Sequence, residues 1–65
     1  MKSKEIILLG AICYGEIDQA GRCKNERASY AVLEVFKKMC GSYEDANHWI
    51  ERLENLHRSY FEVSP

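Results

Sequence analysis

The segment between Lys37 and Asp45 constrains the fold most strongly, because it combines the signals that end one helix with those that begin the next. Lys37 and Lys38 are basic side chains that favour the last turn of a helix, at the negative end of its dipole. Gly41 predicts a left-handed helix stop. Ser42 predicts an N-cap, and Ser42-x-x-Asp45 is a loose capping box. A stop and a start this close together predict an αα-hairpin with a very short connection.

Residues 43–62 form the clearest amphipathic helix of the sequence. At roughly 100° per residue, its apolar positions share one arc about 160° wide, and polar side chains lie opposite. This pattern predicts a helix with one buried face. The apolar positions are Tyr43, Ala46, Trp49, Ile50, Leu53, Leu56, Tyr60 and Phe61.

Residues 26–40 predict a helix that is apolar around more of its circumference, about 200°. Such a helix is expected to touch neighbours on two sides, so we expect it to be central. Asn25 is its predicted N-cap. The apolar positions are Ala28, Ala31, Val32, Leu33, Val35, Phe36, Met39 and Cys40.

The first segment is ambiguous, because residues 6–9 and 11–14 are apolar on every face. We expect a short helix over residues 3–14 that stops at Gly15, followed by a loop over residues 15–25. A strand pair turning at Gly10 and Ala11 is the alternative. The only proline is Pro65, so the body of the chain is free to be helical.

Together these segments predict an all-α fold, a single small domain over residues 1–65 built as a three-helix bundle on the antiparallel αα-hairpin. Charge supports the hairpin, because residues 19–40 carry a net charge of +3 and residues 41–65 a net charge of −3. A chain of 65 residues buries only about 60% of its unfolded surface. We therefore expect the core to be completed by self-association, most simply as a two-fold symmetric homodimer.

The length of the chain and the number and spacing of its cysteines exclude several classes of function. The chain is too short for a dinucleotide fold, a barrel or two lobes around a cleft. Its three cysteines, Cys13, Cys23 and Cys40, cannot all pair within one chain, and their spacing matches no zinc motif. We expect reduced thiols, two of them buried, in a cytoplasmic protein; an intermolecular disulfide through Cys23 is the minor alternative.

The apolar stretch after Lys4 is a poor secretion signal, and no stretch predicts a membrane span.

No constellation for catalysis, metal binding or a cofactor stands out. His48 and His57 are nine residues apart on one predicted helix, so they point to different sides. We expect His57, on the apolar arc, to be partly buried and bonded to a backbone carbonyl or a glutamate. The sequence therefore predicts a protein that is not an enzyme, without metal or cofactor.

A nucleic-acid interface is the alternative function, a small DNA-binding transcriptional regulator that uses a basic loop. Ala11 and Gly15 have the spacing of a helix-turn-helix turn, but the apolar residue expected next is Glu16. With a net charge of −1, no general electrostatic attraction to DNA is expected. The candidate residues are Arg22, Lys24, Arg27, Lys37 and Lys38.

Aromatic content favours protein binding. Seven aromatic residues in 65 are more than a three-helix core of this length can hide. Aromatic side chains at the margin of a helix face are typical interface anchors. The leading prediction is an adaptor, inhibitor or regulator that binds another protein, or a second copy, through an apolar helix face. The predicted contact residues are Trp49, Leu53, Leu56, Tyr60 and Tyr30.

Overall fold

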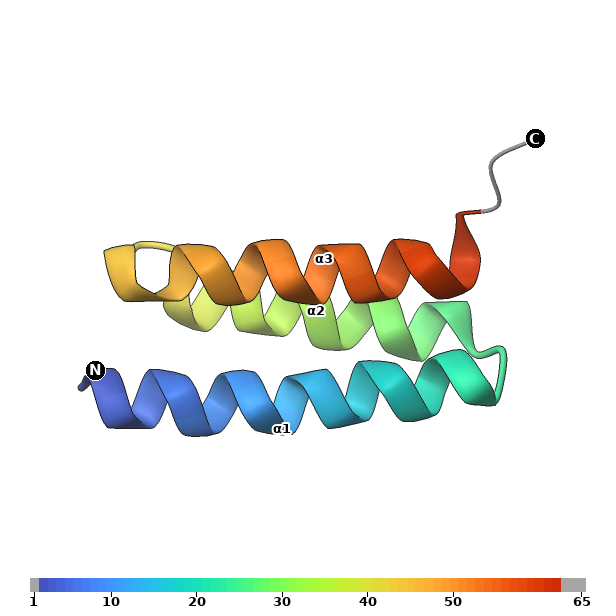
Figure 1. Ribbon diagram of the computed structural model, residues 1–65, viewed down its shortest axis with the longest axis horizontal. Helices are drawn as coiled ribbons and strands as arrows, with labels where there is room; N and C mark the ends of the chain where they lie inside the picture. The colour runs from blue at the N-terminus through green and yellow to red at the C-terminus, as the bar shows by residue number, and fades with distance from the viewer. Residues whose placement is uncertain (1, 63–65) are drawn as a thin grey trace.

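The computed structural model describes residues 2–62, which form three α-helices joined by short connections. Helix α1 spans Ser3–Arg22, α2 spans Glu26–Cys40 and α3 spans Asn47–Phe61, with one 3₁₀ turn, η1, at Glu44–Ala46. The helices alternate in direction, so α1 and α3 run parallel to each other and α2 runs antiparallel to both (Figure 1). The predicted all-α bundle and its αα-hairpin are confirmed, and the described residues contain no strand.

Helix α2 has the bounds that its sequence predicts. The Asn25 side chain accepts a hydrogen bond from the Ala28 backbone N–H at 3.1 Å, which confirms the N-cap. At the other end, Gly41 is not left-handed, since its φ and ψ are −61° and −24°. Its N–H donates to the Lys37 carbonyl at 2.8 Å, so the helical hydrogen-bond pattern simply runs on to Gly41.

The start of α3 differs from the prediction. Ser42 caps nothing; the chain makes the turn η1 first, with Tyr43 at its N-cap position, and α3 begins at Asn47. Asp45, the far member of the predicted capping box, instead accepts a hydrogen bond from the Ser3 hydroxyl at 2.6 Å. Ala46 is fully buried, so the tight turn serves to bring this residue into the core before α3 begins.

Helix α1 continues through every predicted stop in its path. The predictions of an end at Gly15 and a loop over residues 15–25 are wrong, as is the alternative of a strand pair. Gly10 lies against the Trp49 ring and Gly21 against the Tyr60 ring, each so closely that an added Cβ would overlap the ring. Glycine costs an α-helix about 1 kcal/mol relative to alanine. Here that cost is offset by the close approach of α3.

The core draws on all three helices, but α1 is the central one. Helix α1 packs more extensively against α2 and α3 than these two pack against each other, so the prediction that α2 is central is wrong. Only part of the wide apolar arc of α2 is covered, and the rest remains exposed. The buried apolar cluster comprises Ile6, Cys13, Ile17, Leu33, Phe36, Cys40, Ala46, Trp49 and Leu53.

Candidate interaction surface

Two of the residues predicted to contact a partner belong to the core. Leu53 is fully buried and Trp49 is 8% exposed. The Trp49 ring packs on Gly10, and the Arg52 guanidinium lies 4.7 Å from the centre of the ring. These two side chains leave little surface for a partner, so in this structure they hold α3 against α1.

Tyr60, another predicted contact, ties the last turns of α3 to α1. Its hydroxyl donates to Asp18 at 2.6 Å, and the Arg22 guanidinium lies 3.1 Å from the same carboxylate. The hydrogen bond from Tyr60, helped by the charge of Arg22, lowers the pKa of Asp18 below its ordinary value. The same bond raises the pKa of the Tyr60 hydroxyl. Leu56 is half-buried and packs against the core.

Tyr30 is the one predicted contact that is exposed, at 55%. Its ring meets the edge of His57, with 6.2 Å between ring centres. It also lines a shallow hollow on the outer side of α2 together with Ala31 and Val35. Tyr30 therefore lies next to an exposed apolar surface, but on α2 rather than on α3.

A serine–histidine pair is present but is not accessible. His57 Nδ1 and Ser29 Oγ share a hydrogen bond of 2.6 Å, so the predicted partner, a carbonyl or a glutamate, is wrong. Ser29 is fully buried. A nucleophile must reach its substrate, so this pair joins α2 to α3 instead of offering a catalytic site. Among residues 2–62 no three metal-ligating side chains cluster either.

The predicted basic residues do not gather into one patch. Arg22, Lys24 and Arg27 lie around the α1–α2 connection, and Arg22 is paired with Asp18. Lys37 and Lys38 lie ten or more residues farther along α2, about 15 Å away at 1.5 Å per residue.

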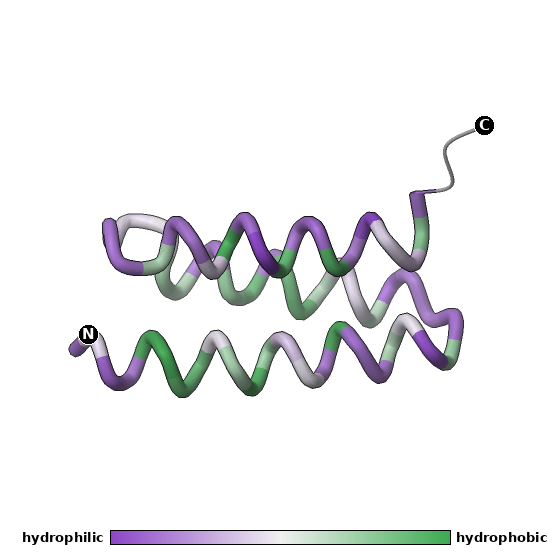
Figure 2. Tube along the Cα trace, in the orientation of Figure 1, coloured by the Kyte–Doolittle hydropathy of each residue, from purple (hydrophilic) through white to green (hydrophobic). Residues whose placement is uncertain are grey.

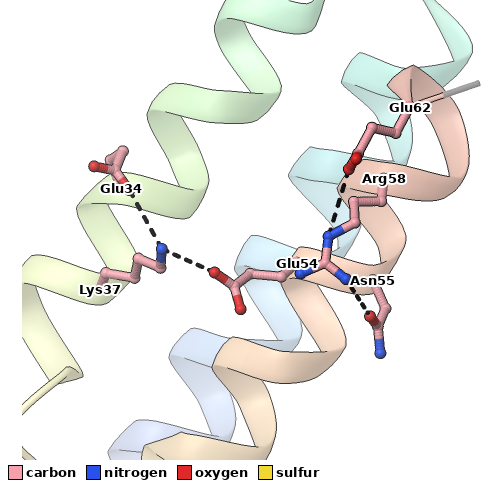
Figure 3. A network of polar contacts seen from close by, with 6 residues as sticks. All are labelled: Glu34, Lys37, Glu54, Asn55, Arg58 and Glu62. Atoms are coloured by element: carbon pink, nitrogen blue, oxygen red, sulfur yellow. Dashed lines mark hydrogen bonds and ion pairs between the residues drawn. The ribbon is translucent and has the colours of Figure 1, made fainter.

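The Lys37 ammonium is already engaged in an ion-pair network. It lies 2.9 Å from Glu54 of α3 and 3.7 Å from Glu34 of its own helix (Figure 3). The hydrogen bond to Glu54 raises the pKa of Lys37. This pair links the basic segment to the acidic one, as the charge pattern of the hairpin predicts, and occupies a group that a phosphate would need.

An exposed apolar surface lies on α1 and α2. Leu8 and Ile12 of α1 are 63% and 53% exposed, and Val35 and Met39 of α2 are 53% and 49% exposed. Hydrophobic positions gather in the N-terminal half of α1 and the C-terminal half of α2, which lie side by side (Figure 2). We name this surface the α1–α2 face. It comprises Leu8, Leu9, Ile12, Cys13, Ala31, Val32, Val35 and Met39, which line two successive hollows.

Charged side chains border the α1–α2 face in an ordered way. Glu5 lines the hollow at one end of the groove between the two helices, and Glu16 lines the hollow at the other. Lys38 lies on the outer side of α2, in the hollow that Ala31 and Val35 also line; Glu34 and Lys37 line it too, but these two pair with each other. The face therefore has acidic groups on its α1 side and a basic group on its α2 side.

Sequence reasoning placed most of the predicted contact residues on α3, whereas the exposed apolar side chains Leu8, Ile12, Val35 and Met39 lie on α1 and α2. Helix α3 has the cleanest amphipathic pattern because its apolar face is fully used by the core. The signal for the α1–α2 face was the excess of apolar positions, all around residues 6–14 and over the wide arc of α2. An apolar surface that exceeds what two neighbouring helices can cover remains exposed.

Comparison of the chain with protein-family models, curated proteins and solved structures gave no match. Within residues 2–62, no helix has both the length and the apolar content that crossing a bilayer requires.

Proposed function

We propose that this chain is a small protein–protein interaction module, and that its binding surface is the α1–α2 face. The observation that supports the proposal is the exposure of Leu8, Ile12, Val35 and Met39, each about half or more, along one continuous groove. Contiguous apolar surface of this kind is costly in water and typically marks a binding site.

The shape of the face indicates the kind of partner. Two packed helices offer ridges and a groove, which accept the apolar side of another helix or helical hairpin. The outer side of α3 is a poor alternative because polar side chains occupy it. The exposed positions of α3 are Asn47, His48, Glu51, Arg52, Asn55, Arg58 and Ser59.

A role without catalysis and a reducing, cytoplasmic location complete the proposal. None of Cys13, Cys23 and Cys40 is part of a disulfide, which is compatible with work in a reducing compartment. The hydrogen-bonded pair of Ser29 and His57 is closed to substrate by the burial of Ser29.

Substitutions at matched exposed isoleucines test the proposal. Ile12 lies on the α1–α2 face, whereas Ile7, equally exposed at 54%, lines a hollow between α1 and η1. We expect Ile12→Glu and Val35→Glu to abolish capture of partner proteins from lysate and Ile7→Glu to leave it intact, with circular dichroism showing all three folded. Unchanged capture by the first two variants, or equal loss in the third, would contradict the proposed surface.

A further inference from the structure

The charges that border the α1–α2 face are complementary to those of the same face on a second copy of the chain. Glu16 and Lys38 form no ion pair with any described residue, so both are free to meet charges on another molecule. The position of Lys38 along the helix axes follows from the packing of α2 on α1, because Met39 lines the same hollow as Leu9. Because Lys38 precedes Met39 in a helix antiparallel to α1, it lies level with the middle of α1, between Glu5 and Glu16.

We propose that the α1–α2 face is covered by a second copy of this chain, with the two-fold axis parallel to the helices. This inference rests on the proposed function and names the partner. Rotation about that axis places α1 of each copy against α2 of the other at the same level. Lys38 of one copy then faces the stretch between Glu5 and Glu16 of the other. The separation along the axis is five or six residues, about 8 Å at 1.5 Å per residue, comparable with the screening length in physiological salt.

The other two-fold arrangement is disfavoured by the same charges. An axis that runs across the helices would place α1 against α1 in opposite directions. Glu5 of one copy would then approach Glu16 of the second, and the two Lys38 side chains would approach each other. Like charges across an interface suppress an arrangement, so the acidic and basic borders select the axis parallel to the helices.

The resulting dimer has a four-helix centre. The α1 and α2 helices of both copies enclose the apolar face, neighbouring helices run antiparallel, and each α3 lies outside. Standard interfaces bury about 800 Å² per partner, about a sixth of the 4770 Å² of this chain. A dimer of this kind would bury Leu8, Ile12, Val35 and Met39 and give this short chain the larger core that it lacks alone.

Analytical ultracentrifugation of the full chain, from micromolar to millimolar concentration at low salt, tests the inference. We expect the wild type to dimerise as concentration rises. Val35→Glu should weaken dimerisation more than about tenfold, because it places an unpaired carboxylate in the interface. The control Ile7→Glu should dimerise like the wild type.

Reversing the charges of Glu16 and Lys38 distinguishes the two possible two-fold axes of the dimer. Glu16→Lys and Lys38→Glu should each weaken the dimer about two- to fivefold, as for exposed charge pairs. The double variant should recover part of the loss, since Glu5 still faces the acidic side chain introduced at position 38. A stronger dimer in Glu16→Lys alone would overturn the proposed axis, because it indicates that α1 meets α1.

The two proposals fail in different ways. A wild type that stays monomeric at every concentration overturns the homodimer and leaves the protein-interaction function, which the capture experiment tests with Ile12→Glu and Val35→Glu. A dimer lost in Ile7→Glu and retained in Val35→Glu overturns both, because the interface then lies elsewhere.

Discussion

The glycines of α1 differ in whether the absence of a Cβ is needed for close packing against α3. Gly10 lies under the Trp49 ring and Gly21 under the Tyr60 ring, whereas a Cβ at Gly15 would meet nothing within 4 Å. The local sequence is similar in each case, a glycine among helix-compatible residues. Only the position of α3 separates a glycine that is needed from one that is not.

Alanine substitution measures this difference. Gly15→Ala should raise the free energy of unfolding by about 0.5–1 kcal/mol, because alanine favours the helix and nothing is displaced. Gly10→Ala gains the same preference but forces the Trp49 ring away, and overpacking typically costs about 1–3 kcal/mol. We expect a net loss of about 1–2 kcal/mol at Gly10, measured by urea unfolding. Equal stabilisation by both substitutions would show that the ring moves freely.

The elements were predictable to different degrees, for physical reasons. Helix α2 was predicted to the residue because its boundaries are marked locally, by Asn25 and by the basic last turn before Gly41. Helix α1 was predicted too short, because Gly15 was taken as a helix stop, whereas it lies inside α1 with open space around the position of its missing Cβ. The start of α3 was missed because Asp45 bonds to Ser3, a partner 42 positions away.

The attachment of α3 to α1 through Tyr60 predicts a pH dependence. Asp18 has a lowered pKa in the folded chain. Its contribution is therefore present above the unfolded pKa of about 4 and is lost as the pH falls through the folded value. Tyr60→Phe removes the main cause of the shift. We expect this variant to be less stable than the wild type at neutral pH, and the difference to shrink in acid.

Urea unfolding at several pH values, followed by circular dichroism, checks this prediction. Tyr14→Phe is the control, because the Tyr14 ring faces Arg52 and its hydroxyl does not contact Asp18. It should keep the pH dependence of the wild type. A difference between Tyr60→Phe and the wild type that does not change with pH would mean that the tyrosine acts only through packing.

At the scale of the whole molecule, the reactivity of the three thiols measures how often the bundle opens and exposes its core. Cys13 and Cys40 are buried and Cys23 is exposed, as the sequence predicted for two of the three. Burial raises the pKa of both buried thiols, and the proximity of Cys40 raises that of Cys13 further. Both therefore lack the thiolate form and the access that reaction requires.

Reaction with Ellman's reagent should show one fast thiol in the folded chain and three in denaturant. Cys23→Ser should remove the fast phase and leave two thiols that react only at the rate of unfolding. A second fast thiol in the native chain would indicate that α1 separates readily from α2, because Cys13 lies at the base of the groove between them.

The overall architecture followed from sequence better than the exposed apolar surface did. Fold class depends on patterns within each helix, which local sequence carries. Exposure of Val35 and Met39 depends on how many helices cover α2, which only the assembled bundle determines. The same apolar residues would be core in a larger bundle and are surface in this one.

The pairing of rings with glycines also constrains how the chain can change in length. Gly10 and Gly21 are eleven residues apart, and so are Trp49 and Tyr60. Eleven residues make close to three full turns, about 16 Å, so both contacts fall on one line between two parallel helices. The two ring–glycine contacts therefore fix the alignment of α1 with α3. An insertion or deletion of one residue within 10–21 or within 49–60 would rotate one contact residue by about 100° about its helix axis and separate that ring from its glycine. The eleven-residue interval is thus as necessary to this fold as the glycines and rings themselves.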